Sequence, residues 1–547
     1  MAAPRSTGRP IAIAVLAVLL AGSSLAPATI GANPTSEIQQ TQGFRKGVTL
    51  AGIREHQAAF QGFADANGGS RVAGLGGYDD SAQYVYDRAL AAGYEVSFQE
   101  FEFLFVGDAS PPVFERLTAP ATDYVDGVDF ATISYSGSGD VTAELSAVDL
   151  VVPSPEPNAS TSGCEASDFA GFVAGNIALL QRGTCTFRLK TENAIAAGAI
   201  AVVVFNEGNP GRTALNFGTM NPPPLDLPAI TTSFAVGDSL RNGVLNGPTG
   251  VEVHLLSDQL AEVRTTRNVI AETPDGDPNR VVIIGAHLDS VPAGPGINDN
   301  GSGSGTILEI AETFAAQGRE PRNKLRFMWY SAEESGLIGS EFYVDSLSPA
   351  ERGQIEMMLN FDMVGSPNMV RFVYDGDNSA FPVTPGQVQA GPPGSGEIER
   401  VFADYFASQG LASEPTPFSG RSDYGPFISA TPGIPAGGLF TGAEGLKTAA
   451  QALTYGGVAG QQYDPCYHLA CDTFAGSGGG TVGGVGLIGL DQMSDAAAHA
   501  VLLFSKRNFD HEPLTATSLS ADASLRQFSV GDAADAPAPA SDYRLDR

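Results

Sequence analysis

Three short apolar runs in the second half of the chain each lead into acidic or histidine residues. Residues 281–286 precede His287 and Asp289, residues 325–330 precede Glu333 and Glu334, and residues 357–361 precede Asp362. Runs this apolar are typical of parallel strands that are buried on both faces of a sheet. Since ligands of open α/β sheets bind beyond the carboxyl ends of the strands, the pattern predicts one site at that edge.

The segments between these runs indicate helices that begin near Ser302 and Gly336, and residues 49–103 indicate a helix, a glycine-rich loop, a second helix and a strand. We therefore expect an α/β fold with a mixed, mostly parallel sheet flanked by helices. Between about 140 and 255 the pattern changes to short strands, such as 176–181 and 199–205, and to proline-rich turns. This change predicts a separate inserted domain, in line with two or three domains for 547 residues.

Both ends of the chain differ from this pattern. Arg5 and Arg9 precede an apolar run over 11–21, and small residues with an Ala26-Pro27-Ala28 step follow it. This arrangement is typical of a signal peptide, and the run is well short of the roughly 20 apolar residues that cross a bilayer. Residues 511–547 are rich in Ala, Ser, Asp and Pro, which predicts a flexible tail or a removable propeptide.

The net charge and the cysteines limit which binding partners and which cellular compartment are expected for this chain. With 30 basic and 61 acidic residues, the net charge of −31 would repel nucleic acid and anionic lipid. The four cysteines fall into two local pairs, Cys164 with Cys185 and Cys466 with Cys471. An exported chain can oxidise such pairs, so we expect two short-loop disulfides and a secreted protein with no nucleic acid or membrane partner.

Two further residues extend the set of candidate metal ligands. Asp299 lies in the glycine-rich segment 296–302, and His468 lies between Cys466 and Cys471. Glycines let a backbone crowd a metal, and histidine nitrogen with carboxylate oxygen suits zinc. Two ions about 3.5 to 4 Å apart need a bridging carboxylate as well as terminal ligands, which these residues can supply.

The motifs, taken together and in order, resemble those of the secreted di-zinc aminopeptidases, a family that also includes the glutamate carboxypeptidases and the transferrin-receptor ectodomain. The resemblance covers about residues 49–508 and implies the zinc-peptidase fold. It rests on the segments Gly285-Ala-His-Leu-Asp-Ser290, Gly296-Ile-Asn-Asp-Asn-Gly-Ser302, Ser331-Ala-Glu-Glu-Ser-Gly336, Asn360-Phe-Asp-Met-Val-Gly365 and Cys466-Tyr-His468.

The resemblance also implies a role for each residue of the site. His287 and Asp362 would bind one zinc, Glu334 and His468 the other, and Asp299 would bridge them. Glu333 would be the general base and Tyr467 the donor to the oxyanion, which are roles that zinc hydrolysis requires. Asp289 would orient the ligating imidazole.

Arg421 would lie near the first residue of the substrate, with a structural salt bridge as the alternative. The segment with Gln181-Arg-Gly-Thr-Cys-Thr-Phe187 resembles the protease-associated (PA) domain, a β-rich non-catalytic insert. The expected organisation is a signal peptide (1–32), a first catalytic segment (46–140), the PA domain (141–256), a second catalytic segment (257–510) and the tail (511–547).

We expect a monomeric aminopeptidase with two zinc ions that acts on peptides with a free, apolar N-terminal residue. The sequence carries no support for calcium. The metal motifs alone leave open a carboxypeptidase or a glutaminyl-cyclase-like enzyme on the same scaffold, because relatives reuse it. A non-catalytic, receptor-like protein is a third hypothesis, against which the complete ligand set and Glu333 argue.

Overall fold

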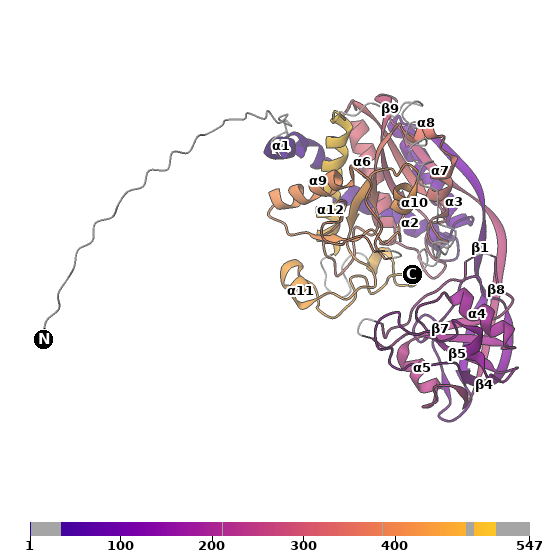
Figure 1. Ribbon diagram of the computed structural model, residues 1–547. Coiled ribbons are helices and arrows are strands. Elements are labelled where there is room, and N and C mark those ends of the chain that lie inside the picture. The colour runs from indigo at the N-terminus through magenta and orange to yellow at the C-terminus, as the bar shows by residue number, and fades with distance from the viewer. Residues whose placement is uncertain (2–33, 210–211, 222, 385–386, 477–485, 510–547) are drawn as a thin grey trace, which may run out of the picture.

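The fold is taken from a computed structural model, which describes residues 1, 34–209, 212–221, 223–384, 387–476 and 486–509. The expected signal peptide (1–32), apart from Met1, and the expected tail (511–547) lie outside these residues. The described chain forms a larger and a smaller lobe that two long strands connect (Figure 1). Among its helices, none combines the length and apolar character that a bilayer crossing requires.

The larger lobe is built on a mixed sheet that is buried on both faces. Its strands are β9 (Asp277–His287), β10 (Asn323–Tyr330), β11 (Ile355–Phe361), β12 (Phe372–Tyr374), β13 (Glu414–Thr416) and β14 (Ala436–Phe440). Strands β10, β9, β11 and β14 run parallel, while β12 is antiparallel to β14 and parallel to β13. The predicted fold class is confirmed, and the three apolar runs are β9, β10 and β11.

Helices cover both faces of this sheet, and alternate residues of β9 enter different cores. Val282 and Ile284 pack into the core with α1 (Pro34–Arg45), α2 (Leu50–Ala66), α3 (Gly76–Ala92), α6 (Gly301–Ala316), α9 (Ser395–Ser408) and α12 (Gly486–Lys506). Val281 and Ile283 pack into the opposite core with α7 (Ile338–Ser346) and α10 (Tyr424–Ser429). This alternation follows from the two-residue period of a strand. Two short helices, α8 (Pro349–Arg352) and α11 (Ala449–Tyr455), lie in connections.

Strands β1 (Glu95–Arg116) and β8 (Gly247–Glu272) join the lobes as an antiparallel ribbon (Figure 1). Their pairing runs from Glu95 opposite Glu272 to Arg116 opposite Val253. The end of β8 also pairs with β10, and its beginning pairs with β4 (Gly139–Ala147) of the smaller lobe. Hydrogen-bonded strands are therefore continuous from one lobe to the other.

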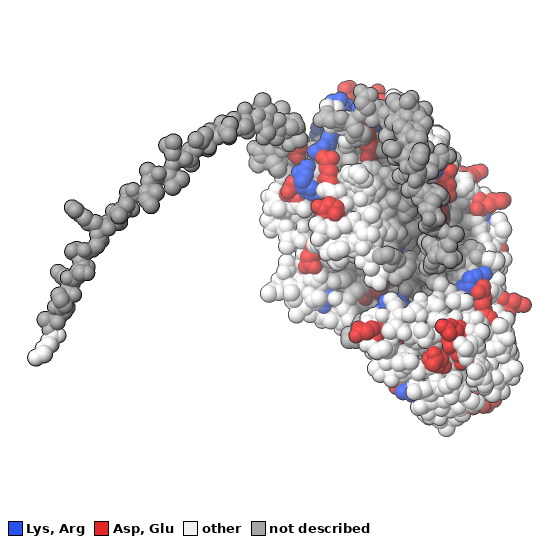
Figure 2. Space-filling view, in the orientation of Figure 1, with Lys and Arg blue, Asp and Glu red and all other residues white. Residues whose placement is uncertain are grey.

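The smaller lobe continues this sheet through β4 and has its own cores on both faces. Its other elements are β2 (Thr122–Asp123), β3 (Phe130–Thr132), β5 (Ile177–Gln181), β6 (Ala201–Phe205), β7 (Ala229–Thr232), α4 (Phe187–Ala196), α5 (Phe234–Leu240) and the 3-10 helix η1 (Ala166–Phe169). Phe114 and Phe130 belong to one of these cores, so the lobe takes in residues that precede 141. Cys164 and Cys185 form the predicted disulfide. Acidic side chains are spread over the face of this lobe that Figure 2 shows.

Candidate metal centre

The ends of three neighbouring strands bring four of the predicted site residues together. His287 is the last residue of β9, Glu333 and Glu334 follow β10, and Asp362 follows β11. Because these strands are parallel, their carboxyl ends meet at one edge of the sheet. His287 and Glu333 are each only 1% exposed, so their charges are held inside the protein.

Asp299 lies between the two histidines of the site. Its Oδ1 is 3.2 Å from Nε2 of His287, and its Oδ2 is 3.2 Å from Nε2 of His468. Nε2 of His287 is also 3.3 Å from Oδ1 of Asp362, and Nε2 of His468 is 3.1 Å from Oε2 of Glu334. The structure therefore brings all five predicted ligands into one cluster, with one carboxylate shared between two halves.

The electrostatics of this cluster call for added positive charge. Burial lowers the pKa of His287, but carboxylates, Glu333 foremost, outweigh it and raise that pKa well above its ordinary value. Burial likewise lowers the pKa of His468, and Glu334 and Asp299 raise it to about 10. Burial raises the pKa of Glu334 to about 7. Since so many carboxylates share a buried space, the cluster must hold either protons or metal cations.

Asp289 contacts three parts of the site at once. Its Oδ1 is 3.6 Å from Nδ1 of His287, and its two oxygens accept the backbone N–H groups of Glu333 and Glu334 at 3.2 Å each. Asp289 is 1% exposed. Its carboxylate thus fixes the turn after β10 and lies beside the imidazole that it was expected to orient.

The glycine-rich loop that carries Asp299 depends on Gly296 and on two aspartates that the sequence did not single out. Gly296 has φ +63°, and a Cβ there would meet the carbonyl oxygen of Asp299 at 2.3 Å, so only glycine fits. The two carboxylate oxygens of Asp472 accept the backbone N–H groups of Asn298 at 2.8 Å and of Asp299 at 2.9 Å. Asp464 accepts the side-chain amide of Asn298 at 2.6 Å.

Arg71 links the loop that follows β9 to the loop that carries Asp299, and this role was also missed. Its guanidinium is fully buried and donates to the carbonyl oxygens of Leu288, of Pro295 at 2.8 Å and of Gly296 at 2.6 Å. Five fixed donors suit such a set of carbonyls. A charged residue inside the glycine-rich loop 67–71 is the one signal in the sequence that could have suggested it.

Two more polar residues that the sequence did not single out lie at the site, and one of them hydrogen-bonds to Asp362. Ser422 donates its hydroxyl to Oδ2 of Asp362 at 2.7 Å. Asp423, the next residue, is 1% exposed, and burial together with Glu333 raises its pKa well above the ordinary value. Both residues begin the segment that leads into α10, so their place at the site depends on the packing of a distant element.

The predicted disulfide between Cys466 and Cys471 closes a loop that carries Tyr467 and His468. The ring of Tyr467 stacks on that of His468, with 3.9 Å between centroids. Arg421 donates to the Tyr467 hydroxyl at 3.5 Å and to a carboxylate oxygen of Glu444 at 2.7 Å. The position of Arg421 is compatible with both expectations, because it lies at the site and also forms a salt bridge.

A cavity of about 290 Å³ opens on one side of the cluster. The cavity is lined by three residues of the cluster, Asp299, Glu333 and Asp362. Arg421, Glu444 and Tyr467 also line it. The rest of its wall is largely apolar and aromatic, from Met363, Phe372, Tyr374, Tyr424, Phe440, Ala443 and Tyr463. Such a space suits an apolar side chain placed next to the cluster of predicted ligands.

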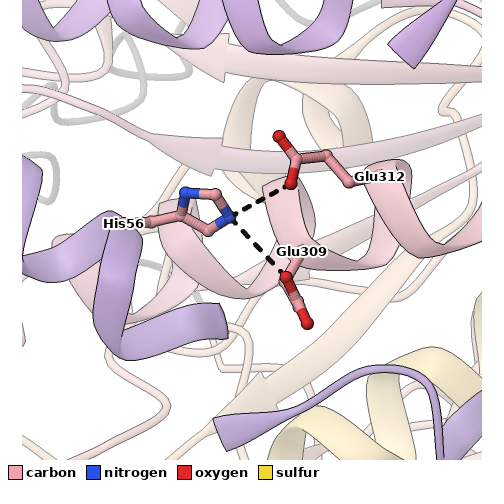
Figure 3. A group of neighbouring side chains, drawn as sticks. All are labelled: His56, Glu309 and Glu312. Carbon is pink, nitrogen blue, oxygen red and sulfur yellow. Dashed lines mark ion pairs between the residues drawn. The ribbon is translucent and has the colours of Figure 1, made fainter. Parts of the chain in front are cut away.

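A second group, His56 with Glu309 and Glu312, has the residue types of a metal site but is better explained as a helix contact. His56 of α2 points its Nε2 between the two carboxylates of α6, 3.8 Å from each (Figure 3). Arg88 already binds Glu312, and Glu309 accepts the backbone N–H of Thr49 at 3.0 Å at the start of α2. Burial lowers the pKa of His56 to about 4, so the imidazole is neutral. A cation would have to compete with Arg88 here.

Comparisons with known proteins bear on both lobes. Residues 268–488 match the model of peptidase family M28, and residues 141–240 match that of the PA domain. An aminopeptidase of Pseudomonas aeruginosa is 48% identical over 414 residues, which is 75% of this chain and 74% of the relative. Leucine aminopeptidase 2 of Trichophyton tonsurans is 42% identical over 430 residues, which is 78% of this chain and 79% of the relative.

Solved structures show the same architecture. The aminopeptidase from Aneurinibacillus sp. strain AM-1 superposes with a TM-score of 0.61 at 25% identity, covering 87% of this chain and 98% of that one. A zinc aminopeptidase from Bacillus subtilis gives a TM-score of 0.55 at 23% identity, covering 84% and 97%. The two-lobed fold is therefore shared along nearly the whole length of these structures.

Proposed function

The chain belongs to peptidase family M28, and on that premise we propose that it hydrolyses the first peptide bond of peptides with an apolar N-terminal residue at a pair of zinc ions. Relatives at 48% and 42% identity make it an aminopeptidase with an inserted PA domain. The family resemblance drawn from the motifs is thereby confirmed. Beyond the family, we propose the number of ions, the role of each residue and the substrate preference.

The donor set fits two zinc ions. The observation that carries this proposal is the position of Asp299, whose two carboxylate oxygens each lie 3.2 Å from the Nε2 atom of a different histidine. Buried Oδ1 of Asp362 and Nε2 of His468 have no hydrogen-bond partner in the described chain, as expected for atoms that await a metal. In our assignment His287 and Asp362 would hold one ion, His468 and Glu334 would hold the other, and Asp299 would contribute to both.

When bound, the two ions would act as Lewis acids and would lower the pKa of a water molecule to about 7. Glu333 lines the cavity beside the ligands, and we assign it the proton transfer from this water to the leaving amine. Asp289 accepts a hydrogen bond from the backbone N–H of Glu333, which fixes the position of the proposed base. The hydroxyl of Tyr467, near Arg421, is assigned to donate to the oxyanion.

The 290 Å³ cavity supports both the apolar preference and the choice of the N-terminal end. Phe372, Phe440 and Tyr463 contribute apolar surface for the first side chain of the substrate. A carboxypeptidase needs an uncompensated cation for the terminal carboxylate. Among the described residues that line this cavity, Arg421 is the basic one, and Glu444 already pairs with it at 2.7 Å. The acidic surroundings suit a substrate ammonium group better than a carboxylate.

We also propose that the protein is secreted and acts as a monomer on free peptides. Support for secretion comes from the signal-peptide pattern of residues 1–32 and from the two disulfides, which persist in oxidising compartments. The net charge of −31 supports the proposal that nucleic acid and anionic membranes are not its partners.

Hydrolysis of leucine p-nitroanilide before and after chelation, and after zinc is restored, tests the mechanism. We expect activity to fall with the chelator, to return with zinc at two ions per chain, and to be lost in Glu333→Ala. The matched control is Glu320→Ala, a glutamate after α6 that contacts none of the site residues in the described chain. Acetylated peptides should resist cleavage. No turnover by fully zinc-loaded wild type would contradict the proposal.

A further inference from the structure

A second cavity, which we call the interlobe groove, lies between the two lobes and reaches the metal centre from the other side. Its volume is about 530 Å³. The larger lobe contributes residues 72–73, 289–293, 334–335 and 468–470, and the smaller lobe contributes residues 105–108, 126–127, 131–132, 134–135 and 217–219. The inserted lobe is thus part of the wall of the space beside the metal ligands.

The interlobe groove and the 290 Å³ cavity divide the ligand cluster between them. The groove touches Glu334 and His468, whereas the smaller cavity touches Asp299 and Asp362, and the two share no lining residue. A peptide whose first side chain fills the smaller cavity has its scissile bond at the ligand cluster. The rest of that peptide would then continue toward Glu334 and His468, which line the groove.

The charge of the groove is one-sided. No lysine or arginine is among the described residues that line it, while Asp108 and Asp126 both face it from the smaller lobe. Asp108 accepts a hydrogen bond from the side chain of Gln259, and neither carboxylate forms an ion pair within the described chain. Asp108 and Asp126 are both exposed residues, so a substrate side chain can approach them from solvent.

We propose that the interlobe groove binds the leaving part of the peptide, and that Asp108 and Asp126 make the enzyme prefer basic over acidic residues there. The inference rests on the proposed aminopeptidase function and deepens it. It gives the inserted lobe a direct part in substrate selection. The apolar wall from Val72, Phe105 and Tyr135 would pack against the aliphatic stem of a lysine or arginine whose charged end reaches the aspartates.

The size of the preference follows from partly solvated charge pairs. An attraction near the surface changes binding by about two- to fivefold, and repulsion of a glutamate is of similar size. The ratio of kcat/KM for lysine over glutamate peptides is therefore expected at about four- to twenty-fivefold. It should shrink at high salt, because the ionic atmosphere screens exposed charges.

The test compares the amidated peptides Leu-Xaa-Gly and Leu-Gly-Xaa, with Xaa as Lys, Gln or Glu, by the rate of leucine release. We expect the order Lys, Gln, Glu in wild type at one or both positions. The double variant Asp108→Asn/Asp126→Asn should bring the ratio close to one, and Asp108→Lys/Asp126→Lys should invert it. Reading the ratio within each variant cancels any loss of overall turnover.

The matched control is Glu252→Gln/Asp238→Asn, which removes the same charge from the smaller lobe at residues that do not line the groove. This control should keep the wild-type ratio. A wild-type ratio near one at both positions, or the same ratio in the Asp108 and Asp126 variants as in wild type, would overturn the inference. Failure of the proposed function is seen separately, as a lack of leucine p-nitroanilide turnover by wild type.

Discussion

Replacing Asp289 by asparagine isolates the contribution of a residue that is proposed to act through the metal ligands. The side chain keeps its shape, but one acceptor oxygen becomes an NH₂ donor that faces a backbone N–H of Glu333 or Glu334. Losing a charge-assisted hydrogen bond of this kind costs about 1.5–3 kcal/mol. The carboxylate charge beside Nδ1 of His287 is lost as well, at 3.6 Å.

Mutating a carboxylate that orients a metal-binding histidine typically weakens metal affinity by about 10- to 100-fold, which is about 1.4–2.7 kcal/mol. We therefore expect Asp289→Asn to bind zinc at least tenfold more weakly in a competition titration with a coloured chelator. Thermal unfolding of the metal-free protein should change less than that of the zinc-loaded protein, because removing a negative charge relieves repulsion in the empty cluster.

The control for this experiment is Asp87→Asn. Asp87 lies on the exposed face of α3 and accepts a hydrogen bond from Gln83 at 2.9 Å. The Asp87→Asn variant should bind zinc with the same affinity as wild type. If Asp289→Asn retains wild-type zinc affinity and loses equal stability with and without zinc, then Asp289 only shapes the loop, and the reasoning is wrong.

Three further predictions concern the base, the disulfide loop and acid stability. Glu333→Gln should lower kcat by about 10²- to 10⁴-fold while zinc content, measured by elemental analysis, stays at the wild-type level. Cys466→Ser/Cys471→Ser removes a cross-link that restricts the unfolded chain and so stabilises the folded protein by about 2 kcal/mol. The unfolding midpoint should therefore fall, and one zinc should dissociate before the other on dialysis. Burial lowers the pKa of both His56 and His499 to about 4. The unfolded state then takes up protons first, and stability should fall between about pH 6.5 and 4, by at most about 3 kcal/mol per histidine. In urea titrations His499→Phe should flatten this profile, and an unchanged slope would refute the assignment.

The residues of the cluster, which are the predicted ligands, could be found from the sequence because each lies in a recognisable local pattern. His287 ends a strand that the sequence shows as an apolar run, Asp362 directly follows another, and Glu333 comes three residues after a third. Parallel strands bring these ends to one edge of the sheet. His468 lies between two cysteines, and Asp299 lies among glycines. Their identity as one cluster then needed only the order of the motifs.

The residues that support the ligands could not be found in this way. Arg71 lies more than 200 positions before the loops that it joins, with a separation of 217 residues from Leu288. Asp464, Asp472 and Asp423 are ordinary acidic loop residues in sequence, and only packing brings them to the site. Strand β1 was likewise expected to end near residue 103, but it continues to Arg116 because β8 supplies a partner beyond that point, with irregular pairing between Asp108 and Val113.

That extended pairing explains how an inserted lobe can take part in selecting a substrate. Strand β10, which leads into Glu333 and Glu334, pairs with β8, and β8 pairs with the segment of β1 that carries Phe105 and Asp108. The proposed base and Asp108 are therefore attached to two strands, β10 and β1, that both pair with β8 in one sheet. A flexible linker would let the wall drift away from the scissile bond, whereas hydrogen-bonded strands hold it at a set distance. If the ribbon keeps this distance, altering its pairing between Asp108 and Gln259 should change selection along the leaving peptide before it changes the hydrolysis of small substrates.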